Sequence, residues 1–283
     1  GSTYIEFSEE TAYNDAKQIV KEAILNFKNR DKEKVLIPEL KSSTTVGFSE
    51  QAILGQLDRV VNSHLDKPGT FKPLVDCLKS GVLRGVVGVV GCNNARSVSN
   101  KAHMEIMKEL IKNDILVVTT GCGASAAGKH GLLTKEARSL AGISTVCELV
   151  DIPPVIHLGS CVDCSRILQV VADVANLLDM DISDLPVAGV APEWMSEKAV
   201  AIGTYVVASG IDTYLGIMPP VGGSSRAVEI LCGELQDMVG AKFTVNENPE
   251  ELAQIIISDI EKKRVHFENL LEEKTNEVAE VEA

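Results

Sequence analysis

The chain has 283 residues, of which 45% are hydrophobic and 24% charged, so it is long and apolar enough to bury a sizeable core. Its net charge of −13 argues against binding to nucleic acid or to an anionic membrane surface. No apolar run reaches the roughly 18 residues of a membrane span, and no signal peptide is recognisable, so we expect a cytoplasmic protein. The opening Gly1-Ser2 is typical of a cloning scar, and we expect a piece of a longer chain.

The first third of the chain is predicted to be mostly helical. Apolar residues recur at three-to-four spacing over residues 8–30, and we expect residues 1–30 to form a helix that packs on the main domain. Further helices are predicted over residues 48–61, with Ser49 as the N-cap, and over residues 71–79.

From residue 82 onward, apolar strands alternate with helices. The strands are expected at residues 82–90, 115–119, 155–158, 186–190, 213–217 and 242–245. The helices are expected at residues 101–112, in segments up to 140, and at 161–178, 196–208, 224–239 and 249–272, with a frayed acidic end after that. This order predicts an α/β fold, a doubly wound, Rossmann-like, mostly parallel sheet with helices on both faces. We expect residues 31–265 to form this domain and residues 266–283 to form an acidic C-terminal tail.

Three of the seven cysteines, Cys92, Cys122 and Cys161, come directly after predicted strands. In a doubly wound sheet the carboxyl ends of the strands lie at one edge, where binding sites form, so these thiols should meet there. Lys198, in the segment after the fourth strand, should join them. Without a secretory signal, loop thiols are more often metal ligands or catalytic groups than disulfide partners. The pattern therefore predicts a metal site.

The other cysteines have different interpretations. Cys77 and Cys232 lie in helical patterns and are predicted to be small buried hydrophobic residues. A functional role for Cys147 stays open. Cys164 follows Cys161 at helical spacing, and the spacing leaves open a fourth metal ligand, a redox pair or packing of Cys164 against the sheet.

Four segments together resemble, in the same order, the C-terminal third of nickel–iron carbon monoxide dehydrogenases. They are GVVGVVGCNNAR, VVTTGCGASAAGKHGLL, HLGSCVDCSRI and APEWMSEKAVAIGTYVVASGIDTYLGIMPPV, and the resemblance runs from about residue 5 to 260. It implies that Cys92, Cys122 and Cys161 are ligands of a nickel–iron–sulfur cluster. It also implies that Lys198 is an acid/base and electrostatic helper and that Ile202 lines the small-ligand pocket.

The resemblance implies the reaction as well, in which carbon monoxide and water become carbon dioxide, two protons and two electrons. It implies a homodimer, a ferredoxin-like electron acceptor, and either a stand-alone enzyme or one inside an acetyl-CoA synthase complex. Family members have further regions with 4Fe-4S clusters and additional cluster ligands, and those motifs are not found in this sequence. We therefore expect the isolated chain to be inactive and largely metal-free.

Three alternatives stay open. The first is a redox enzyme of the related hybrid cluster protein family, and the second is a non-catalytic assembly domain. The third is a nucleotide-binding P-loop, because residues 123–130 read G-x-x-x-x-G-K-H after a predicted strand. His130 stands where a P-loop has the Ser or Thr that binds magnesium, which weakens that interpretation.

A few polar residues near these motifs also have predicted roles. His64, His103 and His266 lie in polar helical contexts and are expected at the surface, whereas His157 is expected to pack near the site. Asp163 and Arg166 are candidates for an ion pair that braces the loop around Cys161.

Overall fold

The computed structural model describes residues 3–6, 8–39, 41, 46–61, 69–193 and 197–282, and it divides the chain into two compact units, residues 1–43 and 44–283. The first unit contains α1 (Ala12–Asn26) and a short 3-10 turn, η1 (Phe27–Asn29), both within the predicted helix. None of the residues of α1, all of which are described, is buried. Its packing on the main domain stays a prediction.

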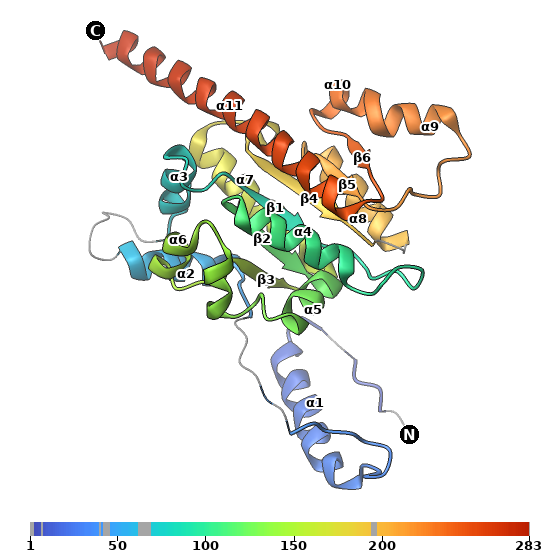
Figure 1. Cartoon of the computed structure of the whole chain (residues 1–283). Coiled ribbons are helices and arrows are strands. Elements are labelled where there is room, and N and C mark those ends of the chain that lie inside the picture. Colours follow the sequence, from blue (N-terminus) through green and yellow to red (C-terminus); the bar gives the residue numbers. More distant parts are fainter. Residues whose placement is uncertain are drawn as a thin grey trace. The chain divides into compact units, whose positions relative to one another are not determined.

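The second unit is built on a six-stranded parallel sheet with the strand order β3-β2-β1-β4-β5-β6 (Figure 1). Its strands are β1 (Gly85–Val89), β2 (Ile115–Thr120), β3 (Val155–Gly159), β4 (Val187–Ala191), β5 (Thr213–Leu215) and β6 (Phe243–Val245). This order is that of doubly wound dinucleotide-binding folds, so the predicted fold class is confirmed. The strand order reverses between β1 and β4, and ligand sites in such sheets form outside the carboxyl ends of the strands at that point.

Helices cover both faces of the sheet, with α4 and α11 on one face and α7 and α8 on the other (Figure 1). The helices of this unit are α2 (Glu50–Val61), α3 (Lys72–Lys79), α4 (Lys101–Lys112), α5 (Gly121–Lys129), α6 (Ser144–Leu149), α7 (Cys164–Leu178), α8 (Glu197–Ala208), α9 (Ser225–Glu229), α10 (Leu235–Val239) and α11 (Pro249–Glu282). Shorter turns are η2 (Lys135–Leu140), η3 (Cys161–Asp163), η4 (Ile182–Asp184) and the π-helical turn η5 (Ile230–Glu234).

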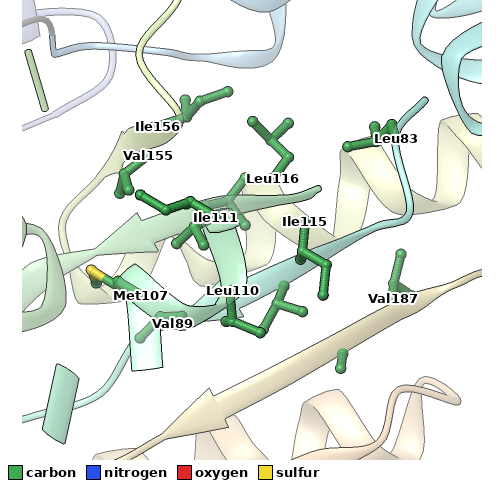
Figure 2. Close-up of a cluster of buried hydrophobic side chains, with 14 of the residues drawn as sticks. Leu83, Val89, Met107, Leu110, Ile111, Ile115, Leu116, Val155, Ile156 and Val187 are labelled. Carbon is green, nitrogen blue, oxygen red and sulfur yellow. The ribbon is translucent and has the colours of Figure 1, made fainter. Parts of the chain in front are cut away.

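The main core lies between the sheet and these helices. All six residues of β2 are buried, because the strand has neighbours on both sides and helices on both faces. Figure 2 shows Met107 and Leu110 of α4 beside Val89 and Ile115. The spacing of the buried residues of α4 at three and four positions turns one face of the helix toward the sheet.

Most predicted elements are present, with differences at their ends. The Ser49 hydroxyl accepts a hydrogen bond of 3.2 Å from the Ala52 backbone amide, which confirms the predicted N-cap of α2. The helix predicted over residues 224–239 is interrupted by η5, and α6 was not predicted. Helix α11 runs well past residue 272, where we expected fraying, and an ion pair of 2.9 Å between Lys274 and Asp179 joins this extension to the end of α7. Within the described residues, no helix is long and apolar enough to span a membrane.

Candidate metal centre

The three cysteines of the predicted site lie at the carboxyl edge of three adjacent strands. Cys92 is in the loop after β1, Cys122 is the second residue of α5 directly after β2, and Cys161 opens η3 after β3. Because these strands are parallel neighbours in the order β3-β2-β1, the three thiols come from one edge of the sheet.

Two glycines beside Cys122 bring its backbone against the neighbouring strand ends. Gly121 has a φ of +54°, and a Cβ atom there would lie 3.0 Å from the Cβ of Cys161. A Cβ atom on Gly123 would lie 2.7 Å from the Val89 carbonyl oxygen, at the end of β1. Only glycine allows both approaches, since a side chain would fill the contact. Cys122 is therefore held between the end of β1 and the turn that begins with Cys161.

The turn that begins with Cys161 is fixed by local hydrogen bonds. The Ser160 backbone amide donates to Asp163 Oδ2 at 2.7 Å, and the Ser160 hydroxyl donates to the same atom at 2.9 Å. Both bonds lower the pKa of Asp163, and the bond from the Ser160 hydroxyl has the larger effect. Arg166 Nε lies 2.8 Å from Asp163 Oδ1, so the predicted ion pair is confirmed. The capping box therefore gives Cys161 a defined backbone position.

Of the other four cysteines, three pack against apolar side chains, and Cys164 is buried beside Thr120. Cys164 is buried, with its Sγ 3.2 Å from Thr120 Oγ1, and burial is the main cause of its raised pKa. This contact supports the packing interpretation of Cys164. Cys147 is fully buried, and burial raises its pKa to about 11. Cys77 and Cys232 are half-buried beside the hydrophobic clusters, where we predicted full burial, and burial raises their pKa too.

This difference separates candidate ligands from packed thiols. Metals bind the thiolate, and burial in apolar surroundings disfavours that form. Cys122 is exposed, and Cys92 and Cys161 are half-buried after strand ends at one edge of the sheet. Cys77 and Cys232 are half-buried as well, but they lie in α3 and η5. Thiolates suit iron and nickel, which makes this donor set chemically suited to part of an iron–sulfur site. Among the described residues, no group of three or more His, Cys, Asp or Glu is arranged so that it could hold a metal ion.

The two remaining predicted residues lie on α8. Lys198 is the second residue of this helix, and its side chain lies outside the described part of the structure. Ile202 is half-buried one helical turn later. Helix α8 follows β4. In the sheet, β4 is the neighbour of β1 on the side opposite to β2.

Comparison with known proteins identifies the family. The sequence profile of the Prismane/CO dehydrogenase family matches residues 1–250. The chain belongs to this family. Carbon monoxide dehydrogenase 1 of Methanosarcina acetivorans is 50% identical over 93% of this chain, and the match covers 41% of that relative. The chain thus spans about two fifths of the length of the curated relatives it matches.

Solved structures of the family have the same fold. The as-isolated, nickel-free carbon monoxide dehydrogenase from Thermococcus sp. AM4, produced without the CooC maturase, is 47% identical with a TM-score of 0.80, covering 93% of this chain and 40% of that chain. An acetyl-CoA synthase/carbon monoxide dehydrogenase structure with NiZn[Fe4S4] and NiNi[Fe4S4] clusters is 35% identical with a TM-score of 0.78, covering 92% of this chain and 40% of that chain.

The structure argues against the P-loop alternative. Helix α5 begins at Gly121, so the G-x-x-x-x-G segment lies inside the helix rather than in a loop before it. Gly123 and three alanines of this helix are buried. A phosphate cradle needs backbone amides that point outward from a loop, and here the amides beyond the first turn of α5 are used for the helix's own hydrogen bonds.

A buried carboxylate that the sequence did not predict lies two residues after β4. Glu193 is 1% exposed, and it accepts hydrogen bonds of 3.2 Å from Asn93 Nδ2 and from the Ala102 backbone amide. Its Oε1 lies 3.5 Å from Nδ1 of His103. Burial by itself would raise the pKa of Glu193, but the neighbouring side chains of His103 and Asn93, together with the charge of His103 and the Asn94 backbone amide, lower it to about 2.

The histidines correct one prediction and confirm another. His103 is fully buried, although we expected it at the surface. A signal was present, because His103 shares the helix face of Ile106, Met107 and Leu110 at three, four and seven positions. His266 is exposed as predicted, with Nε2 at 3.1 Å from Asp184 Oδ1. His64 lies outside the described residues.

Proposed function

We propose that this chain is the C-terminal, cluster-binding domain of an anaerobic carbon monoxide dehydrogenase, which converts carbon monoxide and water to carbon dioxide, two protons and two electrons. The observation that supports this most directly is the placement of three cysteines, Cys92, Cys122 and Cys161, after the carboxyl ends of three adjacent parallel strands. The identity with a relative named carbon monoxide dehydrogenase over nearly the whole chain also supports it.

In this proposal Cys92, Cys122 and Cys161 are ligands of a nickel–iron–sulfur cluster. The bound cluster would supply a Lewis acid and a store for electrons. The chain would supply rigid positions for three of its sulfur ligands. The capping box at Ser160 would fix Cys161, and the close approach of Gly121 would keep Cys122 beside it.

Lys198 and Ile202 would act on the small substrate. Lys198 lies in the first turn of α8, where the helix end favours negative charge. Its ammonium group would stabilise negative charge that develops on the substrate oxygens and exchange protons there. Ile202 follows at a spacing of four, on the same helix face, and would narrow the pocket to molecules as small as carbon monoxide.

The remaining cluster ligands would come from further segments of the complete enzyme, together with 4Fe-4S clusters that pass electrons to a ferredoxin-like acceptor. We propose that the complete enzyme is a homodimer. We also propose that it lies in the cytoplasm, because thiol ligands persist in a reducing compartment. An association with acetyl-CoA synthase is also proposed, since one structural relative combines the two enzymes.

The test uses the complete enzyme, prepared without oxygen, and measures reduction of a viologen dye by carbon monoxide together with nickel and iron content. Replacing Cys92, Cys122 or Cys161 by Ser should each abolish the activity and lower the metal content. The matched control is Cys77→Ala, which removes a half-buried thiol away from the site edge and should keep both. Wild-type metal content in all three serine variants would overturn the ligand assignment. The chain of residues 1–283 by itself should show no activity.

A further inference from the structure

The buried carboxylate of Glu193 connects two segments of the candidate site. We propose that Glu193 is a positioning residue that fixes the loop of Cys92 relative to the end of β4, the strand that Lys198 follows in the chain. The roles of Cys92 and Lys198 in this statement rest on the function proposed above. The contacts of Glu193 themselves do not.

The first contacts reach the Cys92 loop. Asn93 directly follows Cys92, and its Nδ2 donates to Glu193 Oε2 at 3.2 Å and to Asn100 Oδ1 at 2.9 Å. The two bonds use both hydrogens of this amide group, so the side chain has one orientation. The Asn94 backbone amide faces the same carboxylate and helps to lower the pKa of Glu193. Two successive residues after Cys92 therefore face one carboxylate.

The same carboxylate caps α4. Asn100, the residue before this helix, has a φ of 68° and makes no side-chain cap hydrogen bond. Instead the Ala102 backbone amide donates to Glu193 Oε1 at 3.2 Å. A negative group at a helix N-terminus is stabilised by the unpaired amides and the helix dipole. Glu193 thus replaces a local cap from a position 91 residues away in the chain.

His103 links the carboxylate to the end of β1. Its Nδ1 lies 3.5 Å from Glu193 Oε1, and its Nε2 lies 3.3 Å from the carbonyl oxygen of Val90, two residues before Cys92. Both ring nitrogens of this fully buried side chain face oxygen acceptors. The loop of Cys92 is consequently held on its C-terminal side by the hydrogen bond of Asn93 to Glu193. On its N-terminal side the His103 ring, whose Nδ1 makes no hydrogen bond, lies between Val90 and Glu193.

The backbone of Glu193 belongs to the segment after β4, five residues before Lys198. Its neighbour Pro192 lies tightly against the end of β5, since a Cβ atom on Gly216 would meet the Pro192 carbonyl oxygen at 2.1 Å. This packing leaves Pro192 and its neighbour Glu193 little room to shift. The carboxylate therefore bridges β1 and β4, the pair of strands at which the sheet order reverses.

The test compares Glu193→Gln with Glu261→Gln in the chain of residues 1–283. Glu261 is a matched control, because its half-exposed carboxylate pairs with Arg84 at the opposite, amino end of β1. Amide hydrogen exchange is followed residue by residue by NMR. In Glu193→Gln, the Asn94 and Ala102 amides should exchange about tenfold faster, because they lose a charged acceptor. The amides of β2 should keep their rates, and Glu261→Gln should leave Asn94 and Ala102 unchanged.

Two results would overturn the proposal. One is unchanged exchange at Asn94 and Ala102 in Glu193→Gln, and the other is faster exchange that is equal throughout β1, β2 and α4, which would indicate a general loss of stability. If Glu193→Gln does not fold, Asn93→Ala removes a single donor and should still speed exchange at Asn94.

A second readout uses the complete enzyme. Glu193→Gln should lower kcat for carbon monoxide oxidation about tenfold or more and change the electron paramagnetic resonance spectrum of the cluster, whereas Glu261→Gln should alter neither. An unchanged spectrum and kcat would refute the positioning role. A wild-type enzyme without carbon monoxide oxidation would refute the proposed function instead, and the exchange result would still decide whether Glu193 holds the loop.

Discussion

Asn93, in the loop after β1, donates a hydrogen bond of 3.2 Å to Glu193, in the segment after β4. The two residues are 100 positions apart in the chain, and β2 and β3 lie between them in sequence. The contact can form only when β1 and β4 pair directly in the folded sheet. The ionisation of Glu193 is for this reason coupled to folding.

This coupling predicts a specific pH dependence of stability. The pKa of Glu193 is about 2 in the folded chain against an ordinary 4.5, so its contribution is present above about pH 5 and is lost as the pH falls toward 2. The full contribution is about 3 kcal/mol. Urea unfolding at pH 7 and pH 4 should show that the stability difference between wild type and Glu193→Gln shrinks by about 1 kcal/mol at the lower pH. A stability difference that is the same at both pH values would contradict the lowered pKa of Glu193 in the folded chain.

The approach of Gly121 to Cys161 predicts different effects of two similar substitutions. Gly121 and Gly131 both have positive φ, at +54° and +75°, so alanine costs about 1 kcal/mol of backbone strain at either position. A Cβ atom at position 121 would also press on Cys161, whereas nothing lies within 4 Å of one at position 131. Gly121→Ala should lower the free energy of unfolding, measured in urea, by about 1–3 kcal/mol more than Gly131→Ala does. Equal losses of stability in the two variants would show that the turn of Cys161 moves aside for the added methyl group at no cost.

A buried arginine on α11 should be essential for stability. Arg264 is 3% exposed, and its Nη1 donates to the carbonyl oxygens of Leu78 at 3.0 Å and Leu83 at 3.3 Å. Arg264→Met keeps much of the side-chain stem but leaves these carbonyls unpaired, so it should cost about 2–4 kcal/mol. The control is Lys262→Met, which removes an exposed ion pair with Asp259 and should cost less than about 1 kcal/mol. Similar unfolding midpoints for both variants would disprove this role of Arg264.

The sequence alone predicted those features that depend on local periodicity and on topology. The alternation of strands and helices follows from the spacing of apolar residues, as α4 shows, since its bounds Lys101–Lys112 agree with the prediction. The meeting of Cys122 with the turn of Cys161 follows from a general rule for parallel sheets. Neither prediction needed knowledge of a specific contact between residues that are far apart in the sequence.

Features that depend on distant contacts were missed. The cap on α4 comes from Glu193, and nothing near Asn100 in the sequence indicates it. The extension of α11 past residue 272 involves the contact of Lys274 with Asp179, which is equally remote. His103 was missed for a different reason, because a histidine was counted as polar although it lay on the apolar face of its helix.

The division of the cysteines predicts an order of alkylation by iodoacetamide in the reduced native chain. Cys122 is exposed and should react fastest, whereas Cys147 is buried. The pKa of Cys147 is about 11 against an ordinary 9.0, which by itself reduces its thiolate population at pH 8 about 100-fold. Mass spectrometry of peptides taken at successive times should therefore show Cys122 modified long before Cys147. In urea all seven thiols should react at similar rates, which shows that the native order comes from the fold. Native modification of Cys147 as fast as that of Cys122 would contradict the separation of ligand thiols from packed thiols on which the metal site depends.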